Sequence, residues 1–164
     1  MDGLSNAASV IAVIQLAESV YKLCQGYIFS VKDARRDIGL LCKEIMALHD
    51  VLVAVREWFK EGDSTTSGTV GQLRETSRRP LDICQKELES IGKTLERFQS
   101  TTDPEPQNTM RRFGMRALKW PFSEKDLKAR IDALSGCKET LNLALTAETT
   151  YVMRTPCVGI VSNY

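Results

Sequence analysis

Histidine is almost absent from this sequence, and its scarcity limits the chemistry that the chain can perform. His49 is the only histidine among the 164 residues. A thiol hydrolase needs a base within hydrogen-bond reach of its cysteine, and Cys42 lies two turns before His49 on one predicted helix. Two turns of rise separate these side chains by roughly 10 Å, which is too far for proton transfer. We therefore expect His49 to lie on the flank of its helix, and we predict a chain without catalytic residues that is not an enzyme.

The cysteines lack the spacing of a zinc site or of a disulfide framework. Their number is odd, and no CxxC motif occurs. Cysteines of this kind are typical of reduced thiols in a cytosolic protein, where they serve as small apolar side chains. We predict buried, reduced thiols and neither a metal nor another cofactor. The five cysteines are Cys24, Cys42, Cys84, Cys137 and Cys157.

An excess of charge of one sign is also missing. The 22 Lys and Arg residues nearly balance the 21 Asp and Glu residues, so no overall field attracts the chain to nucleic acid, which we consider a disfavoured partner. Gly92-Lys93-Thr94 resembles the end of a phosphate-binding loop, but the glycine required five residues earlier is replaced by Glu87. We expect this triplet to be part of a helix, and the sequence indicates no small-molecule substrate.

No uncharged run reaches the length of a membrane span, although the N-terminal segment comes close. Between Gly3 and Val31 the only charges are Glu18 and Lys22, and the charge-free residues 3–17 fall short of the roughly 20 apolar residues of a span. The helix predicted here is apolar on nearly all sides. It is therefore either the buried centre of a bundle, which we favour, or a segment that moves from protein core to lipid. The residues that would form a membrane-active helix are Leu4, Val10, Ile11, Val13, Ile14 and Leu16.

Three further segments show the three-and-four spacing of amphipathic helices. The first spans residues 31–60, the second begins at Pro80, and Ser123 with Asp126 forms a capping box that opens the third. A short extra helix is predicted over residues 70–78. The pattern predicts an all-α, up-and-down bundle of four main helices with the apolar N-terminal helix at its centre.

A basic and aromatic stretch separates the last two long helices. Pro121 prevents an extended amphipathic helix there. One interpretation is an interfacial patch in which each cation gains about 1 kcal/mol on anionic lipid. The other, which we favour, is a loop whose apolar residues dock on the bundle while its arginines stay hydrated. The patch consists of Arg111, Arg112, Phe113, Arg116, Lys119, Trp120 and Phe122.

The size and the ends of the chain indicate one intracellular domain. A chain of 164 residues has the size of a single domain, which we place at residues 1–150, followed by a non-periodic tail at 151–164. The N-terminus lacks the basic region and the cleavage site of a secretory signal. We expect a cytoplasmic protein, with recruitment to a membrane as a further expectation.

Four stretches of the sequence together resemble a known family. They are MDGLSNAASVIAVIQLA, VKDARRDIGLLCKEI, RPLDICQKELESI and ALKWPF, and the similarity covers residues 1–147. The chain resembles the fungal N-terminal domain of STAND proteins, a HeLo-like domain that is also catalogued as the azaphilone pigments biosynthesis cluster protein L N-terminal domain. The resemblance implies a helical bundle that in many relatives precedes a nucleotide-binding domain. In the best-studied cousins an apolar N-terminal helix permeabilises membranes during programmed cell death.

Two functions from different classes fit this sequence. The first is a non-enzymatic fungal signalling or effector domain of the cell-death type that self-associates and engages membranes through its N-terminal helix. The second is a soluble protein-interaction or accessory protein encoded with a fungal secondary-metabolite gene cluster, without catalysis. Both predict protein partners or self-association, and the first adds an anionic membrane surface.

Overall fold

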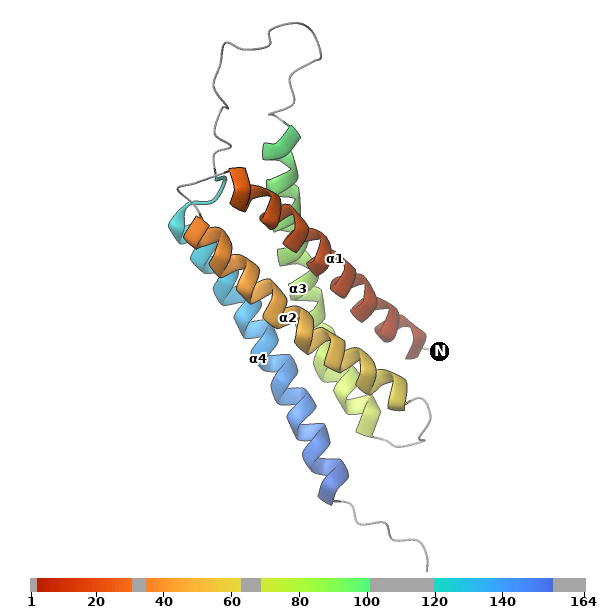
Figure 1. Cartoon of the computed structure of the whole chain (residues 1–164). Coiled ribbons are helices and arrows are strands. Elements are labelled where there is room, and N and C mark those ends of the chain that lie inside the picture. The colour runs from red at the N-terminus through yellow and green to blue at the C-terminus, as the bar shows by residue number, and fades with distance from the viewer. Residues whose placement is uncertain (1–2, 31–34, 63–68, 101–119, 155–164) are drawn as a thin grey trace, which may run out of the picture.

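Helices account for nearly all of the residues that the structure describes. The structure is a computed structural model, and it describes residues 3–30, 35–62, 69–100 and 120–154, among which no strand occurs. The helices are α1 (Gly3–Ser30), α2 (Arg35–Gly62), α3 (Thr69–Ser100) and α4 (Glu124–Arg154) (Figure 1). The predicted all-α class is confirmed.

The four helices alternate in direction along the chain and form a four-cornered bundle (Figure 1). α1 packs against α2 and α3, and α4 packs against the same two helices. α1 and α4 therefore occupy opposite corners, as do α2 and α3. Helices that follow one another in the chain run antiparallel, which is the up-and-down arrangement predicted from the sequence.

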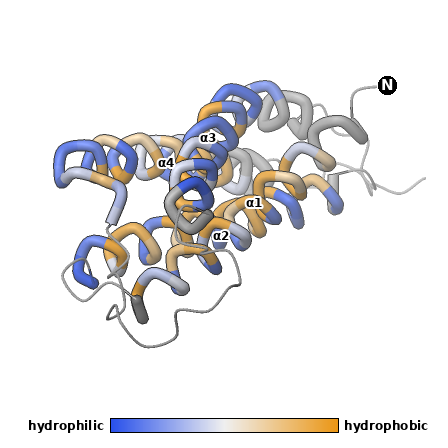
Figure 2. Tube along the Cα trace, turned by 90° about the horizontal axis from the view of Figure 1, so that it is seen from above, coloured by the Kyte–Doolittle hydropathy of each residue, from blue (hydrophilic) through white to orange (hydrophobic). Residues whose placement is uncertain are grey.

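The core is built from one apolar face of each helix. In α2 the apolar residues that recur every three or four positions from Ile38 to Phe59 form a seam, and every one of them is buried. This spacing returns each side chain to the same face of the helix. Figure 2 shows the hydrophobic residues of the helices gathered toward the middle of the molecule. The largest fully buried side chains are Tyr27, Ile38, Leu41, Ile45, Leu48, Leu52, Leu88, Ile91, Leu95, Leu134 and Leu141.

α1 lies at a corner of the bundle, so the central position expected for it is not confirmed. One face of α1 is buried, and the opposite face is exposed to solvent. The described exposed positions up to Gln15 hold neutral side chains, several of them small, such as Ala8, Ser9 and Ala12, and the exposed charges Glu18 and Lys22 follow. Because alanine and serine on the outside carry no charge, the helix has an apolar character all round although only one side requires burial.

α3 is a single helix that runs through Pro80, so the prediction of a separate short helix over residues 70–78 is wrong. Proline cannot donate a hydrogen bond to the carbonyl oxygen of Thr76, and a proline inside a helix costs about 3 kcal/mol. The apolar side chains of this turn are nevertheless packed against the core, since Pro80 and Leu81 are both buried. Their apolar burial works against the cost of the missing hydrogen bond.

α4 begins at the predicted capping box. The Asp126 backbone N–H donates to the Ser123 hydroxyl oxygen at 3.2 Å, and the same hydroxyl donates to a carboxylate oxygen of Asp126 at 2.6 Å. The Leu127 N–H donates to the Ser123 carbonyl oxygen at 2.9 Å, which closes the first turn. At its other end α4 continues to Arg154. Residues 151–154 of the predicted tail are therefore helical, and residues 155–164 lie outside the described part of the chain.

Candidate functional site

The six residues predicted to form a membrane-active helix occupy different environments in the bundle. Ile11 is 41% exposed, and Leu16 is half-buried against the core. Leu4 belongs to the first turn of α1, but its side chain is outside the described residues. The other three are buried, so most of this apolar stripe holds α1 onto its neighbours. These three are Val10, Val13 and Ile14.

The solvent-facing side of α1 carries no charge from Ala8 to Gln15, over about two turns. We define the outer face of α1 as the exposed residues that recur there every three or four positions. Ile11 is the only large apolar residue that α1 exposes among its described side chains. The remaining members are small or neutral, so this surface can approach another molecule without desolvating a charge. The outer face of α1 consists of Ala8, Ile11, Ala12 and Gln15, and it ends at the exposed Glu18.

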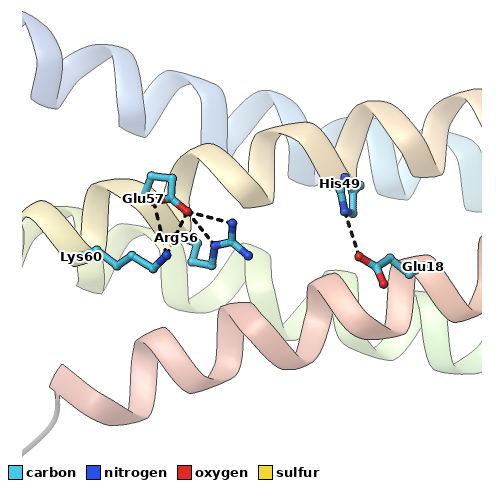
Figure 3. Close-up of polar contacts among 5 residues, drawn as sticks. All are labelled: Glu18, His49, Arg56, Glu57 and Lys60. Atoms are coloured by element: carbon cyan, nitrogen blue, oxygen red, sulfur yellow. Dashed lines mark hydrogen bonds and ion pairs between the residues drawn. The ribbon is translucent and has the colours of Figure 1, made fainter.

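The first charged residue of α1 contacts α2 (Figure 3). Glu18 Oε1 lies 3.4 Å from His49 Nε2, and the side chain of His49 is 21% exposed while that of Glu18 is 51% exposed. His49 Nδ1 lies 3.5 Å from Asp50 Oδ1 on its own helix. His49 therefore lies at the edge of the α1–α2 contact, on the flank of α2, where it joins two helices at their rim.

The exposed side of α2 carries a cluster of charges that has no counterpart on α1 (Figure 3). Arg56 Nη2 lies 2.8 Å from Glu57 Oε1, and Lys60 Nζ lies 3.2 Å from the same oxygen. The hydrogen bond from Arg56, followed by the one from Lys60, holds the pKa of Glu57 below its ordinary value. Charges that satisfy one another on a solvated face contribute little to association.

Trp120 and Phe122, two members of the basic and aromatic patch, pack onto the end of the bundle. The ring of Trp120 meets Tyr27 edge-on with centroids 5.8 Å apart, and it meets Phe122 edge-on at 5.1 Å. The Arg130 guanidinium lies 5.2 Å from the centroid of Phe122, within the range of a cation–π contact. The other five patch residues lie outside the described part of the chain, and the membrane role of the patch stays a prediction. These five are Arg111, Arg112, Phe113, Arg116 and Lys119.

Tyr27 fixes the C-terminal part of α1 to α3. Its hydroxyl donates to the carbonyl oxygen of Leu95 at 2.8 Å inside the bundle. Burial, reinforced by the neighbouring Cys24, raises the pKa of the Tyr27 phenol above its ordinary value, because the charged form would have to remain in an apolar environment. The sequence indicated this residue only as one of the apolar members of α1.

Two further polar contacts join α4 to its neighbours. Lys138 Nζ donates to Glu44 Oε1 on α2 at 2.6 Å, and both side chains are largely buried. Arg130 Nη1 lies 3.1 Å from Ser90 Oγ and 3.3 Å from Glu87 Oε2 on α3. Charged groups in these positions set the register of the helices, because each fits only one partner across the contact.

The four described cysteines form two pairs across helix contacts, an arrangement that sequence reasoning missed. Cys24 on α1 lies beside Cys42 on α2, and Cys84 on α3 lies beside Cys137 on α4. All four are buried free thiols. A signal for the first pair was present in the sequence. In an antiparallel hairpin with a short connection, residues at equal distances from that connection face each other.

The hydrogen bond within each pair separates the acidities of its two thiols. The hydrogen bond between the two thiols, together with burial, raises the pKa of Cys24. The same hydrogen bond lowers the pKa of Cys42. The second pair behaves alike, with the pKa of Cys84 raised and that of Cys137 lowered by their mutual hydrogen bond. In each pair the thiol whose pKa is lowered is therefore the more acidic of the two.

Gly92, Lys93 and Thr94 lie within α3, as predicted. Thr94 Oγ1 donates to the Ser90 carbonyl oxygen at 2.8 Å, and Lys93 Nζ lies 3.5 Å from Glu89 Oε2 one turn earlier. These are contacts within a helix, in which the backbone N–H groups are not free to surround a phosphate. Over the described part of the chain, no three His, Cys, Asp or Glu residues are grouped so that they could hold a metal ion.

The structure places this chain in the class of four-helix bundles. Its polar contacts between helices, such as Glu44 with Lys138, join neighbouring helices of the bundle. Within the described residues, α1 to α4 all lack a stretch with the length and apolar character that crossing a bilayer requires. The chain belongs to the pigment biosynthesis cluster protein PigL N-terminal family, whose family model matches residues 1–156. The pigment-cluster family named from the resemblance is therefore confirmed, and the kinship with HeLo-like and STAND domains stays a prediction. Comparison with curated proteins and with solved structures gives no match.

Proposed function

We propose that this chain is a non-enzymatic association module that binds a second copy of itself through the outer face of α1. The observation that carries the proposal is the contrast in charge between helices. The outer face of α1 has no charge from Ala8 to Gln15, whereas the exposed side of α2 presents charges such as Lys43, Asp50 and Glu57. An interface at this face of α1 would bury no unpaired charge, so it costs less to desolvate than the exposed side of α2.

The composition of this face supports a self-complementary contact. Ala8 and Ala12 lie one turn apart and allow a second helix to approach closely, while Ile11 supplies an apolar anchor at 41% exposure. Gln15 is neutral and can both donate and accept, so it can pair with its own copy across a two-fold axis. The face ends at Glu18, which returns charge to the same side of the helix one turn after Gln15.

Sedimentation equilibrium of purified protein tests this proposal. We expect wild-type chain to dimerise at micromolar concentration and Ile11→Glu to be monomeric, because the substitution places a charge in the middle of the contact. Leu143→Glu is the matched control, since Leu143 is 71% exposed on α4 at the opposite corner. It should dimerise as wild type does. A monomeric wild type, or equal loss in both variants, would contradict self-association and would favour a different protein as partner.

A second proposal concerns membranes, and it is supported by the charge-free length of α1. Residues 3–17 carry no charge on either side of the helix, so an α1 released from the bundle would present lipid with its buried stripe as well as its outer face. Such release requires the loss of the contacts of Val10, Val13 and Ile14 with the core. We propose that an anionic membrane surface recruits the chain in this way, in the manner of a cell-death effector.

Leakage from vesicles containing phosphatidylserine tests the membrane proposal. We expect wild type to release an entrapped dye and Ile11→Glu to release much less, with Leu143→Glu again as the control. Val13→Glu is a poor probe, because Val13 is 1% exposed and a charge there would unfold the bundle. An absence of leakage with wild type would remove this proposal and leave an accessory interaction domain, associated with a fungal biosynthetic gene cluster, as the function.

A further inference from the structure

Two buried cysteine pairs have no role in the functions proposed above. One pair, Cys24 and Cys42, lies between α1 and α2, and the other, Cys84 and Cys137, lies between α3 and α4. Each pair thus joins two helices that are consecutive in the chain and antiparallel (Figure 1). The placement is the same in both halves of the molecule, with one thiol pair inside each helical hairpin.

The register of the first hairpin supports the pairing independently of the thiols. Glu18 contacts His49 across the hairpin at 3.4 Å. Cys24 follows Glu18 by six residues, and Cys42 precedes His49 by seven. Because the two helices are antiparallel with nearly equal rise per residue, these steps bring the cysteines to the same level along the bundle.

The second hairpin shows a similar relation. Arg130 contacts Ser90 at 3.1 Å. Cys137 follows Arg130 by seven residues, and Cys84 precedes Ser90 by six. These steps bring the two buried cysteines to the same level along this hairpin as well.

We propose that Cys24 with Cys42 and Cys84 with Cys137 are the sites of two intramolecular disulfides that form when the folded, reduced protein meets hydrogen peroxide. The inference stands apart from the association and membrane proposals, since it requires neither a dimer nor a lipid surface. Disulfide formation needs two neighbouring cysteines, which each pair provides and which a lone buried cysteine lacks.

The reaction balances with peroxide as the only oxidant. Cys42 first loses its proton to solvent, and its thiolate attacks one peroxide oxygen. The O–O bond breaks, and the leaving hydroxide takes up one proton from solvent, which replaces the proton that Cys42 released, to become water. Cys42 is then a sulfenic acid. The sulfur of Cys24 attacks the sulfenic sulfur, a second water leaves with the Cys24 proton, and the S–S bond forms. Two thiols are oxidised and one peroxide is reduced to two water molecules for each bond.

Exposure and acidity assign the same residue of each pair to the first step. Cys42 and Cys137 retain 8% and 5% exposure, whereas Cys24 and Cys84 have none. Cys42 and Cys137 are also the thiols whose pKa their partners lower. Peroxide is small enough to reach a sulfur with this limited access, and the fully buried cysteine then resolves the sulfenic acid before further oxidation.

Peptide mapping of the peroxide-treated protein tests the proposal. Reduced chain is exposed to hydrogen peroxide, residual thiols are alkylated in denaturant, and the digest is analysed by mass spectrometry without reductant. We expect two cross-linked peptide pairs, 24 with 42 and 84 with 137, each lighter by two hydrogen atoms than its reduced form. We also expect a melting temperature about 5–10 °C higher, because a cross-link restricts the unfolded chain, and dithiothreitol should reverse this gain.

Single substitutions show whether the two sites act separately. Cys42→Ala should lose the 24–42 cross-link and keep the other, and Cys137→Ala should do the reverse. Cys157→Ala removes the fifth cysteine and should keep both cross-links. The proposal is overturned if wild type yields sulfinic acids, unmodified thiols or only cross-links to Cys157. This wild-type map decides the matter even where an alanine variant fails to fold.

Discussion

α1 and α2 are both 28 residues long and both bury one apolar face, but they differ on the side that meets solvent. α2 exposes charged residues at about every second turn, including Arg36, Lys43 and Asp50. From Ala8 to Gln15 α1 exposes alanine, serine and glutamine, with Ile11 among them, and its exposed charges come only after Gln15. The inner faces of the two helices therefore serve the same purpose, while the outer faces suit different surroundings.

The difference shows which part of a helix carries information about function. An apolar seam is required of any helix in a bundle, so the seams of both helices follow from the fold alone. Charge on an outer face keeps a helix solvated and apart from other molecules. Its absence from α1 between Ala8 and Gln15 has no structural purpose in a monomer, and this is the reason that we place the association surface there.

The two helices also differ in how they are attached. α2 has a close, largely buried ion pair to α4 through Glu44 and Lys138, at 2.6 Å. α1 has a longer and more exposed contact through Glu18 and His49, at 3.4 Å, and a buried hydrogen bond from Tyr27 to α3. α1 is consequently held by apolar packing and one tyrosine, and α2 by apolar packing and charge.

Matched truncations of the two seams should have the largest effects on stability. Ile45→Ala on α2 should lower the free energy of unfolding by about 3–4 kcal/mol, and Ile14→Ala on α1 by about 2–3 kcal/mol, since Ile45 is fully buried and Ile14 is 5% exposed. Guanidinium denaturation followed by circular dichroism measures both. Leu143→Ala, at an exposed position on α4, should change stability by less than about 0.5 kcal/mol. A cost below about 1 kcal/mol for Ile14→Ala would show that α1 is not part of the cooperative core.

Tyr27→Phe should lower the free energy of unfolding by about 1–2 kcal/mol near neutral pH, because it removes the hydrogen bond to Leu95. The pKa of Tyr27 is raised in the folded state, so the folded protein holds the phenol proton more tightly than the unfolded chain. This contribution is fully present below the ordinary pKa of 10.0 and falls as the pH rises above it.

The stability difference between wild type and Tyr27→Phe should accordingly shrink between pH 9 and pH 11, a range of about one unit to either side of the ordinary tyrosine pKa. Urea titrations at each pH measure this difference. Tyr21→Phe is the control, because the Tyr21 side chain is only half-buried on the same helix. A difference that stays constant across this range would mean that Tyr27 is as accessible to hydroxide in the folded protein as in the unfolded chain.

The core was predictable from the sequence, whereas the placement of the helices around it was not. Spacing of three and four residues identified the seam from Ile38 to Phe59, and each of its members is buried. The same reasoning placed α1 at the centre, because a count of apolar residues does not distinguish a large side chain from an alanine on the outside. It also divided α3 at Pro80, since local propensity takes no account of the packing that keeps Ser77 and Pro80 buried.

The contacts between helices required the three-dimensional structure for a different reason. Tyr27 with Leu95, and Lys138 with Glu44, are separated by 68 and 94 residues in the chain. No local pattern relates such residues before the order of the helices around the bundle is known. Cys24 and Cys42 are an exception, because the short connection of their hairpin sets their register. Sequence reasoning that treated each cysteine singly did not use this constraint.

Neutralisation of the two ion pairs should give the smallest effects and should sharpen the contrast in attachment. Glu44→Gln leaves Lys138 largely buried without a counter-charge, and we expect a loss of about 1–2 kcal/mol in the free energy of unfolding. Glu18→Gln affects a pair in which Glu18 is 51% exposed, and solvent screening should limit its loss to about 0.5 kcal/mol or less. Urea denaturation in low and in high salt measures both changes, and salt should suppress only the smaller one. If Glu18→Gln proved as costly as Glu44→Gln, α1 would be attached by charge as firmly as α2, and its release onto a membrane would lose its structural basis.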